Sequence, residues 1–395
     1  MAASLQLLAA LHAAGRLEEA ERLGPEVETA DVALAAAKLT ILGDVARRLG
    51  RNELAVERFR EATNLQPGAA ALQFNLSTAL AALGRTVEAD QALDRAVQLD
   101  PGLGNARLER AWRALRRLDY ACAATEFAAS EQVGFAVAEA RELAAWCRRF
   151  APVGDASGIH RPLVSIVIPC FNYGEFVREA VESVRAQTYD RTEIIVVEGG
   201  STDGVTPGIV AGLAEGNVRI VAQDRPTLPG ANRNAGIQIA SGDLICCLDA
   251  DDKLAPSYLE KAVFVIQELG YDIAGAGAAE FGSGNRTRSF MLRPSVGDFL
   301  QANELVVQAV FRRDIWYKAG GFRDIEHPEG HVHEDWDFWL RAVALGAKVF
   351  NMSWEHLIHI RGHASVHRVS RRALRIDHQR AVLRAMNADV LESSA

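Results

Sequence analysis

Two stretches decide the fold: Val164–Tyr173, which reads VSIVIPCFNY, and Leu244–Asp252, which reads LICCLDADD. Each is an apolar, β-branched run that predicts a buried strand and ends in polar residues. Similar runs at 193–198 and 218–223 lie between them, and helices are expected near 175–186, 206–215, 230–240 and 256–269. This alternation predicts an α/β domain with a Rossmann-like, mainly parallel sheet, whose ligands bind at the carboxyl ends of the strands.

The second stretch ends in three carboxylates, those of Asp249, Asp251 and Asp252. Like charges this close repel unless a cation neutralises them, and hard divalent ions prefer carboxylate and phosphate oxygens. The pattern therefore predicts a Mg²⁺ or Mn²⁺ site. The alternative is a helix cap and turn before Pro256, which suits Asp252 well and Asp251 poorly.

The motifs occur in one order along the chain. They are IPCFNY at 168–173, AVESVRAQTY at 180–189, EGGSTDG at 198–204, ANRNAG at 231–236 and DADD at 249–252. This ordered set resembles the family 2 glycosyltransferases from about Val164 to His367. The resemblance implies the GT-A fold and transfer of a sugar from a nucleoside diphosphate donor, with a UDP-sugar favoured, to an acceptor hydroxyl with inversion.

The resemblance also implies roles for single residues. Donor-binding positions fall at Pro169, Phe171, Asn172, Glu198, Arg233, Asp249 and Ala250, and metal ligands at Asp249, Asp251 and His363. Many relatives have two acidic residues where this chain has Glu198 and Gly199, so the base of the nucleotide is left open. Asp203 is expected to cap the next helix instead of binding the donor.

The acceptor side is implied by GGFR at 320–323 and HVHEDWDFWL at 331–340. Asp335 takes the position of the catalytic base, the carboxylate that accepts the proton of the attacking hydroxyl. Glu334 is its nearest competitor. The alternative for this pair is an acidic helix start that complements the helix dipole.

Seven of the ten histidines lie between His327 and His367, which raises the hypothesis of a zinc site. No cysteine accompanies them, and Arg361-Gly362-His363 resembles the Arg-x-His of the family. His363 is therefore expected to complete the metal site or to contact the diphosphate. His367 is the alternative, because the spacing after His363 is one residue short.

The first third of the chain repeats itself: NLQPG at 64–68 returns as QLDPG at 98–102, a step of 34 residues. This is the tetratricopeptide period. The resemblance to tetratricopeptide repeats covers about residues 1–135, although Leu118 stands where the third copy would have glycine. We expect an all-α repeat domain at 1–150, a linker at 151–162 and the GT-A domain at 163–395. The repeats would form a concave surface for a protein partner or acceptor, or a spacer or dimerisation element.

The composition excludes other classes. A net charge of −8 argues against nucleic-acid binding, and five cysteines without a Cys-x-x-Cys spacing indicate neither a disulfide framework nor a thiolate zinc site. No apolar run reaches the length of a membrane span. We therefore expect a cytoplasmic protein, either free or peripheral to the inner face of the membrane, acting on a saccharide, lipid-linked saccharide or protein acceptor. The rival interpretation is an inactive, transferase-like scaffold that binds a partner through its repeats.

Overall fold

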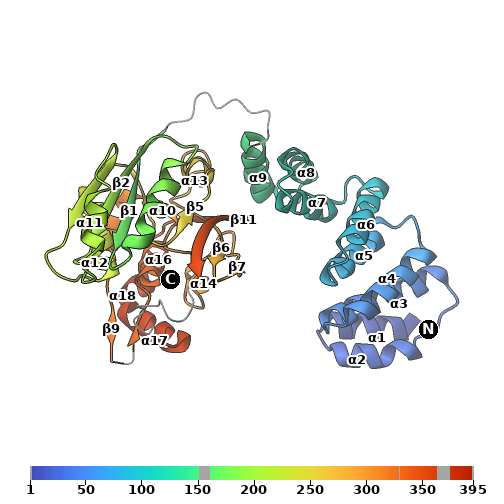
Figure 1. Ribbon diagram of the computed structural model, residues 1–395. Coiled ribbons are helices and arrows are strands. Elements are labelled where there is room, and N and C mark those ends of the chain that lie inside the picture. The colour runs from blue at the N-terminus through green and yellow to red at the C-terminus, as the bar shows by residue number, and fades with distance from the viewer. Residues whose placement is uncertain (1, 151–160, 329, 363–373, 394–395) are drawn as a thin grey trace. The chain divides into compact units, whose positions relative to one another are not determined.

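The computed structural model describes residues 2–150, 161–328, 330–362 and 374–393. Two compact units divide the chain, Met1–Asp155 and Ala156–Ala395, of which the first is helical and the second α/β (Figure 1). The predicted fold class is therefore confirmed. The boundaries at 150 and 163 stay predictions, since most of the expected linker at 151–162 lies outside the described residues. In the part of the chain that the structure describes, no helix is long and apolar enough to cross a membrane.

The first unit is a row of short helices joined by tight turns (Figure 1). They are α1 Ala2–Ala13, α2 Leu17–Leu23, the 3-10 turn η1 Gly24–Glu26, α3 Val32–Arg48, α4 Asn52–Leu65, α5 Ala70–Ala82, α6 Thr86–Leu99, α7 Gly104–Arg116, α8 Tyr120–Gln132 and α9 Val137–Phe150. Equivalent positions of the sequence repeat are buried in each copy: Ala55, Phe59 and Ala62, then Ala89, Leu93 and Ala96, then Ala123, Phe127 and Ser130. These small and apolar residues let neighbouring helices approach closely.

The turns inside the helix pairs share a left-handed backbone. Gly50 has φ 75° between α3 and α4, and Gly84 has φ 70° between α5 and α6. Leu118, between α7 and α8, adopts φ 60° although it carries a side chain. The third copy therefore keeps the repeat geometry without the glycine, at a conformational cost of roughly 1–2 kcal/mol.

Charged residues join the second helix pair to the third. Arg113 of α7, only 9% exposed, donates to the Ser77 hydroxyl of α5 at 2.9 Å and pairs with Asp90 of α6 at 3.1 Å. Two more arginines pair with α6, in Arg110–Asp94 and Arg117–Asp90, whereas Arg107 pairs with Glu126 of α8 inside the third helix pair. The contact between α6 and α7 therefore combines apolar packing with buried and exposed charge.

The second unit is built on one curved sheet in the order β3-β2-β1-β4-β8-β6-β11-β5, with β7 paired to β6 (Figure 1). The strands are β1 Val164–Cys170, β2 Thr192–Glu198, β3 Val218–Ala222, β4 Leu244–Cys247, β5 Lys253–Leu254, β6 Ile273–Gly282, β7 Thr287–Arg288, β8 Val310–Arg312 and β11 Val349–Gly362, while β9 Glu326–His327 and β10 Gly330–His331 form a separate hairpin. The helices are α10 Gly174–Arg185, α11 Thr206–Ala211, α12 Pro229–Ile239, α13 Tyr258–Gln267, α14 Val296–Phe299, α15 Arg313–Ala319, α16 Glu334–Ala344, α17 Ile376–Met386 and α18 Ala388–Ser393.

The strand order reverses at β1, because β2 and β3 lie on one side of it and β4 on the other. β1 to β4 are parallel, as predicted. Most side chains of β1, β2 and β4 are buried, whereas in the edge strand β3 only Val218 is. In such a sheet the ligand crevice forms at the carboxyl ends of the strands beside the reversal. The segments Pro169–Tyr173 and Leu248–Asp252 leave the sheet at this place.

The far half of the sheet departs from the parallel pattern. β8 runs antiparallel to both of its neighbours, β4 and β6, and β6 is parallel to β11. The register of β11 shifts between Met352 and Ile358, where Glu355 forms a buried ion pair with Lys261 of α13. Beyond this shift β11 continues to Gly362, and the Arg361 N–H donates to Asp252, which follows β4, at 2.8 Å.

Candidate active site

The turn after β4 gives its three carboxylates different surroundings. Asp249 accepts a hydrogen bond from Arg233 Nη2 at 2.7 Å, and Asp251 is partly exposed at the crevice. Asp252 is buried and accepts from Gln308 Nε2 at 2.6 Å and from the Arg361 backbone N–H at 2.8 Å. Burial raises the pKa of Asp249, against the effect of Arg233, and raises that of Asp252 further.

The alternative interpretation of Asp252, as the cap of the next helix, is therefore wrong. The residue that precedes α13 as its N-cap is Ser257, and Asp252 instead ties β11 to the segment before β8. Only the turn itself was predicted correctly, with the Asp252 N–H donating to the Asp249 carbonyl at 3.0 Å. Asp249 and Asp251 remain as the two carboxylates of this turn that line the crevice.

Arg233 of α12 joins the two sides of the site. Its side chain is 4% exposed and bonds Asp249 through one nitrogen and Glu334, the first residue of α16, through the other. Burial disfavours the charged forms of Arg233 and Glu334, but the attraction between opposite charges in this group of three residues is the stronger effect. It raises the pKa of Arg233 and lowers that of Glu334. The end of β4 and the start of α16 are thus held together by one guanidinium.

Asp335 follows Glu334 in the first turn of α16 and has different partners. Its Oδ2 accepts from Asn303 Nδ2 at 3.0 Å, and its Oδ1 accepts from the Trp336 N–H at 2.8 Å. Burial and the neighbouring Glu334 carboxylate raise the pKa of Asp335. A carboxyl group with a raised pKa binds a proton more readily, which is the property a general base requires.

A cavity of about 530 Å³ opens beside these residues. It includes seven of the predicted site residues: Pro169, Phe171, Arg233, Asp249, Ala250, Asp251 and Glu334. Its other wall comes from the β9–β10 hairpin and the residues around it: Asp324, Ile325, Glu326, His331, Val332 and His333. Three other predicted site residues that the structure describes, Asn172, Glu198 and Asp335, do not line the cavity. His363 and His367 lie outside the described residues.

Asn172 and Glu198 shape the loop after β2. Glu198 accepts from the Ser201 N–H at 2.7 Å and the Gly200 N–H at 3.2 Å, and Asn172, with φ 57°, accepts from the Thr202 N–H at 2.8 Å. Their direct contact with a donor stays a prediction. Asp203 accepts from the Val205 N–H at 3.1 Å and from the Thr206 N–H at 2.9 Å, which forms the predicted turn before α11, although the N-cap of that helix is Val205.

Two neighbours of the site were missed in the sequence. Asp324 accepts from the Gly230 and Ala231 N–H groups, both at 2.8 Å, at the start of α12. Asn303 holds Asp335 as described above. Asp324 comes directly after the quoted GGFR motif, which was a usable signal. Asn303 lies in an irregular segment and carries no signal of its own.

The residues present fit a hard divalent cation only in part. Asp249 and Asp251 supply carboxylate oxygens at one turn, the donor type that Mg²⁺ and Mn²⁺ prefer. Within the described ranges, however, no group of three or more His, Cys, Asp or Glu side chains is arranged to hold a metal. The predicted third ligand, His363, is outside those ranges.

Comparison with known proteins relates part of the chain to one family. Residues 165–325 match the family described as glycosyl transferase family 2. The succinoglycan biosynthesis protein ExoO of Rhizobium meliloti is 37% identical over 29% of this chain and 32% of its own length. The glycosyltransferase GlyG of Streptococcus pneumoniae is 29% identical over 38% of this chain and 50% of its own length. The chain thus spans a third to a half of these two relatives.

Solved structures give weaker likenesses. S. aureus TarS 1–349 in complex with UDP-GlcNAc has a TM-score of 0.47 at 17% identity, covering 58% of this chain and 70% of that one. The mannosyltransferase PcManGT from Pyrobaculum calidifontis, in complex with GDP-Man and Mn²⁺, has a TM-score of 0.42 at 18% identity, covering 70% and 84%.

Residues 165–325 form a family 2 glycosyltransferase domain, which is an enzyme domain. The matched segment contains β1, β4 and Arg233. It ends before α16, so Glu334 and Asp335 lie beyond it.

Proposed function

We propose that the chain is an inverting glycosyltransferase that moves a sugar from a nucleoside diphosphate donor, favoured as a UDP-sugar, to an acceptor hydroxyl. The acceptor is a saccharide, a lipid-linked saccharide or a protein. One observation carries the proposal: the cavity at the strand-order reversal brings the Asp249–Asp251 turn and the first turn of α16 to one place, bridged by Arg233. The cytoplasmic location expected from the sequence belongs to the same proposal.

In this mechanism Asp249 and Asp251 are the residues that would hold Mg²⁺ or Mn²⁺, and a bound ion would supply positive charge beside the diphosphate of the donor. Pro169, Phe171 and Ala250 line the cavity where the donor would bind, and Arg233 keeps Asp249 in place. Asp335 accepts the proton of the acceptor hydroxyl as that oxygen attacks the anomeric carbon from the face opposite the nucleotide. Glu334, which lines the cavity, is the alternative base.

The test is a screen for nucleotide release. Purified chain is incubated with UDP-glucose, UDP-galactose, UDP-GlcNAc or GDP-mannose, each with Mn²⁺, with Mg²⁺ or with EDTA. We expect at least one UDP-sugar to release UDP in the presence of the metal and not with EDTA. Absence of donor binding and of release across the panel would favour the scaffold interpretation.

Asn303 provides a test of the base through pH. The hydrogen bond from the Asn303 side-chain amide favours the charged form of Asp335. Asn303→Leu removes this bond and should raise the pKa of that carboxyl further. Because the base acts when ionised, the acid side of the pH–rate profile should move to higher pH, with the larger loss of rate at the acid end. Asn285→Leu, at an exposed asparagine, is the matched control. Profiles that superimpose would contradict the role of Asp335.

A further inference from the structure

Helix α17 lies beyond the segment that matches the family and buries two amide side chains. Gln379 is 4% exposed, and Asn387, the residue that ends the helix, is 1% exposed. A buried amide is costly unless its polar atoms are hydrogen-bonded. Each amide has one partner at the beginning of α16, the helix that carries Glu334 and Asp335.

Gln379 holds the residue directly before α16. Its Oε1 accepts from the His333 N–H at 3.0 Å, and its Nε2 donates to the Leu374 carbonyl at 2.9 Å. His333 is the N-cap of α16 and its own side chain makes no capping bond. The Leu374 N–H in turn donates to the His331 carbonyl at 2.9 Å. The entry into α16 is therefore fixed from α17 by a side chain and by the backbone that precedes it.

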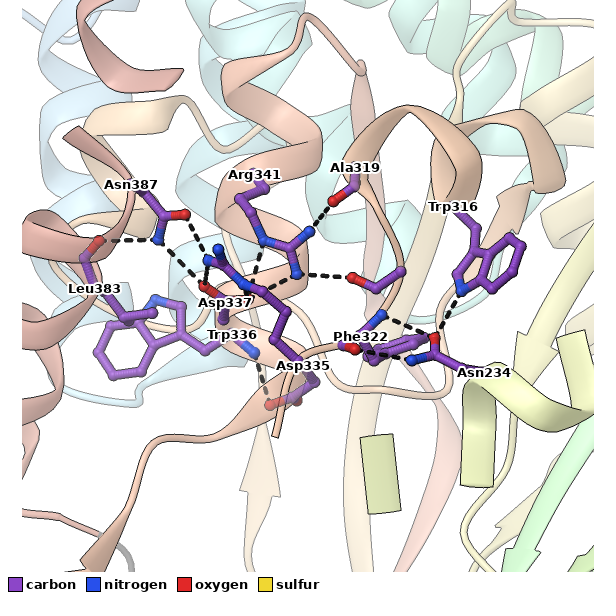
Figure 2. A network of polar contacts seen from close by, with 12 residues as sticks. Asn234, Trp316, Ala319, Phe322, Asp335, Trp336, Asp337, Arg341, Leu383 and Asn387 are labelled. Atoms are coloured by element: carbon purple, nitrogen blue, oxygen red, sulfur yellow. Dashed lines mark hydrogen bonds and ion pairs between the residues drawn. The ribbon is translucent and has the colours of Figure 1, made fainter. Parts of the chain in front are cut away.

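Asn387 holds α16 one turn further on, as Figure 2 shows. Its Nδ2 donates to Asp337 Oδ1 at 3.2 Å, and its Oδ1 accepts from Arg323 Nη2 at 2.7 Å. Asp337 is fully buried, and Arg323 and Arg341 both pair with it. The same network continues through Arg341 to the Gly321 carbonyl at 2.8 Å, in the loop beside α15.

We propose that Gln379 and Asn387 are positioning residues for the proton-accepting carboxylates of α16, an inference that rests on the proposed function. Their two anchor points, His333 and Asp337, are four residues apart and flank Glu334 and Asp335. Neither amide lines the cavity among the described residues, so both act through α16 and not by touching a substrate. Helix α17 is thereby part of the active site's framework.

The physical reason is the sensitivity of proton transfer to geometry. A base works only within hydrogen-bond reach of the proton that it accepts. A displacement of about 1 Å by a change far from the chemistry lowers a rate by up to about 100-fold. Donor binding depends mainly on the β1 and β4 turns, which these amides reach only indirectly, through Glu334 and Arg233. Loss of the anchors should therefore reduce turnover more than donor affinity.

The experiment uses the full chain and the variants Gln379→Met and Asn387→Leu, which keep the side-chain size and remove the hydrogen bonds. Arg384→Gln, at an exposed position of α17, is the control. The readouts are kcat and KM for UDP release from the active UDP-sugar with Mn²⁺, UDP affinity by calorimetry, and hydrogen exchange of a peptide spanning 331–337. We expect kcat to fall about 10-fold or more for Gln379→Met. KM and UDP affinity should stay within about two-fold, and exchange at 331–337 should quicken.

Each outcome bears on the inference. Unchanged kcat with faster exchange would overturn it, because the anchor would then be lost without consequence for the reaction. Equal loss of kcat and UDP affinity would also overturn it and indicate general destabilisation. Gln379→Glu retains an acceptor for the His333 N–H and should recover part of the kcat lost in Gln379→Met. A wild-type chain that binds UDP but releases none from any UDP-sugar would instead refute the proposed function, and this inference with it.

Discussion

Asp335→Asn should lower the rate of sugar transfer by about 100-fold or more and leave the affinity for UDP unchanged. The amide keeps the size of the side chain, and its single oxygen can still accept from Asn303 or from the Trp336 N–H, which bind separate oxygens of the carboxylate. It cannot accept the proton of the acceptor hydroxyl. Single-turnover rates of the variant and the wild type measure the loss of transfer, and calorimetric titration with UDP measures the affinity.

Glu334→Gln is the comparison that decides between the two carboxylates. Glu334 pairs with Arg233, so its neutralisation should disturb the bridge between α12 and α16 and affect donor affinity as well as rate. If Glu334→Gln reduces transfer more than Asp335→Asn and leaves UDP affinity intact, the roles are reversed and Glu334 is the base.

Asp251→Ala should abolish the metal dependence of donor binding while the fold stays intact. Asp251 is partly exposed at the end of a turn and lines the cavity, so its side chain contributes little to the core. Calorimetric titration of UDP with Mn²⁺ and with EDTA gives the measurement. A variant that binds UDP with unchanged metal dependence would remove Asp251 from the metal site.

The adjacent Asp252 provides the contrast for this experiment. Asp252→Ala removes the acceptor of two hydrogen bonds inside the protein, from Gln308 and from the Arg361 N–H. A buried donor left without its partner costs about 1–3 kcal/mol. The Tm should therefore fall for Asp252→Ala and remain close to that of the wild type for Asp251→Ala.

The parallel half of the sheet was predictable from the sequence because its signals are local. β1, β2 and β4 each contain an apolar run that ends in a motif at the edge of the sheet, and β3 is a shorter, β-branched run. The strand order then brings the β1 and β4 turns together without further information. The placement of Asp249 and Asp251 beside Pro169 and Phe171 could be predicted for this reason.

The rest depends on pairing between distant residues. β8 has three residues and runs antiparallel to both of its neighbours, β4 and β6. No local sequence pattern predicts this pairing. The local sequence around Asp252 indicated a helix cap, but its hydrogen-bond partners are 56 and 109 residues away along the chain. Likewise Gln379 is an ordinary polar residue of an amphipathic helix until its contact with His333 is known.

Ionic strength should weaken some helix contacts of the first unit more than others, because arginines of α7 and Arg117 directly after it form ion pairs. Contact between α4 and α5 is apolar, through Phe59, Leu76 and Leu80, and dissolved salt hardly weakens it. The contact from α6 to α7 also uses charge, and in the pair Arg117–Asp90 the arginine side chain is 57% exposed, within reach of counterions. At physiological ionic strength the screening length is about 8 Å, so this pair is weakened while the buried Arg113 is largely protected. The attachment of the third helix pair, which also carries the strained Leu118 turn, therefore depends in part on the surrounding electrolyte.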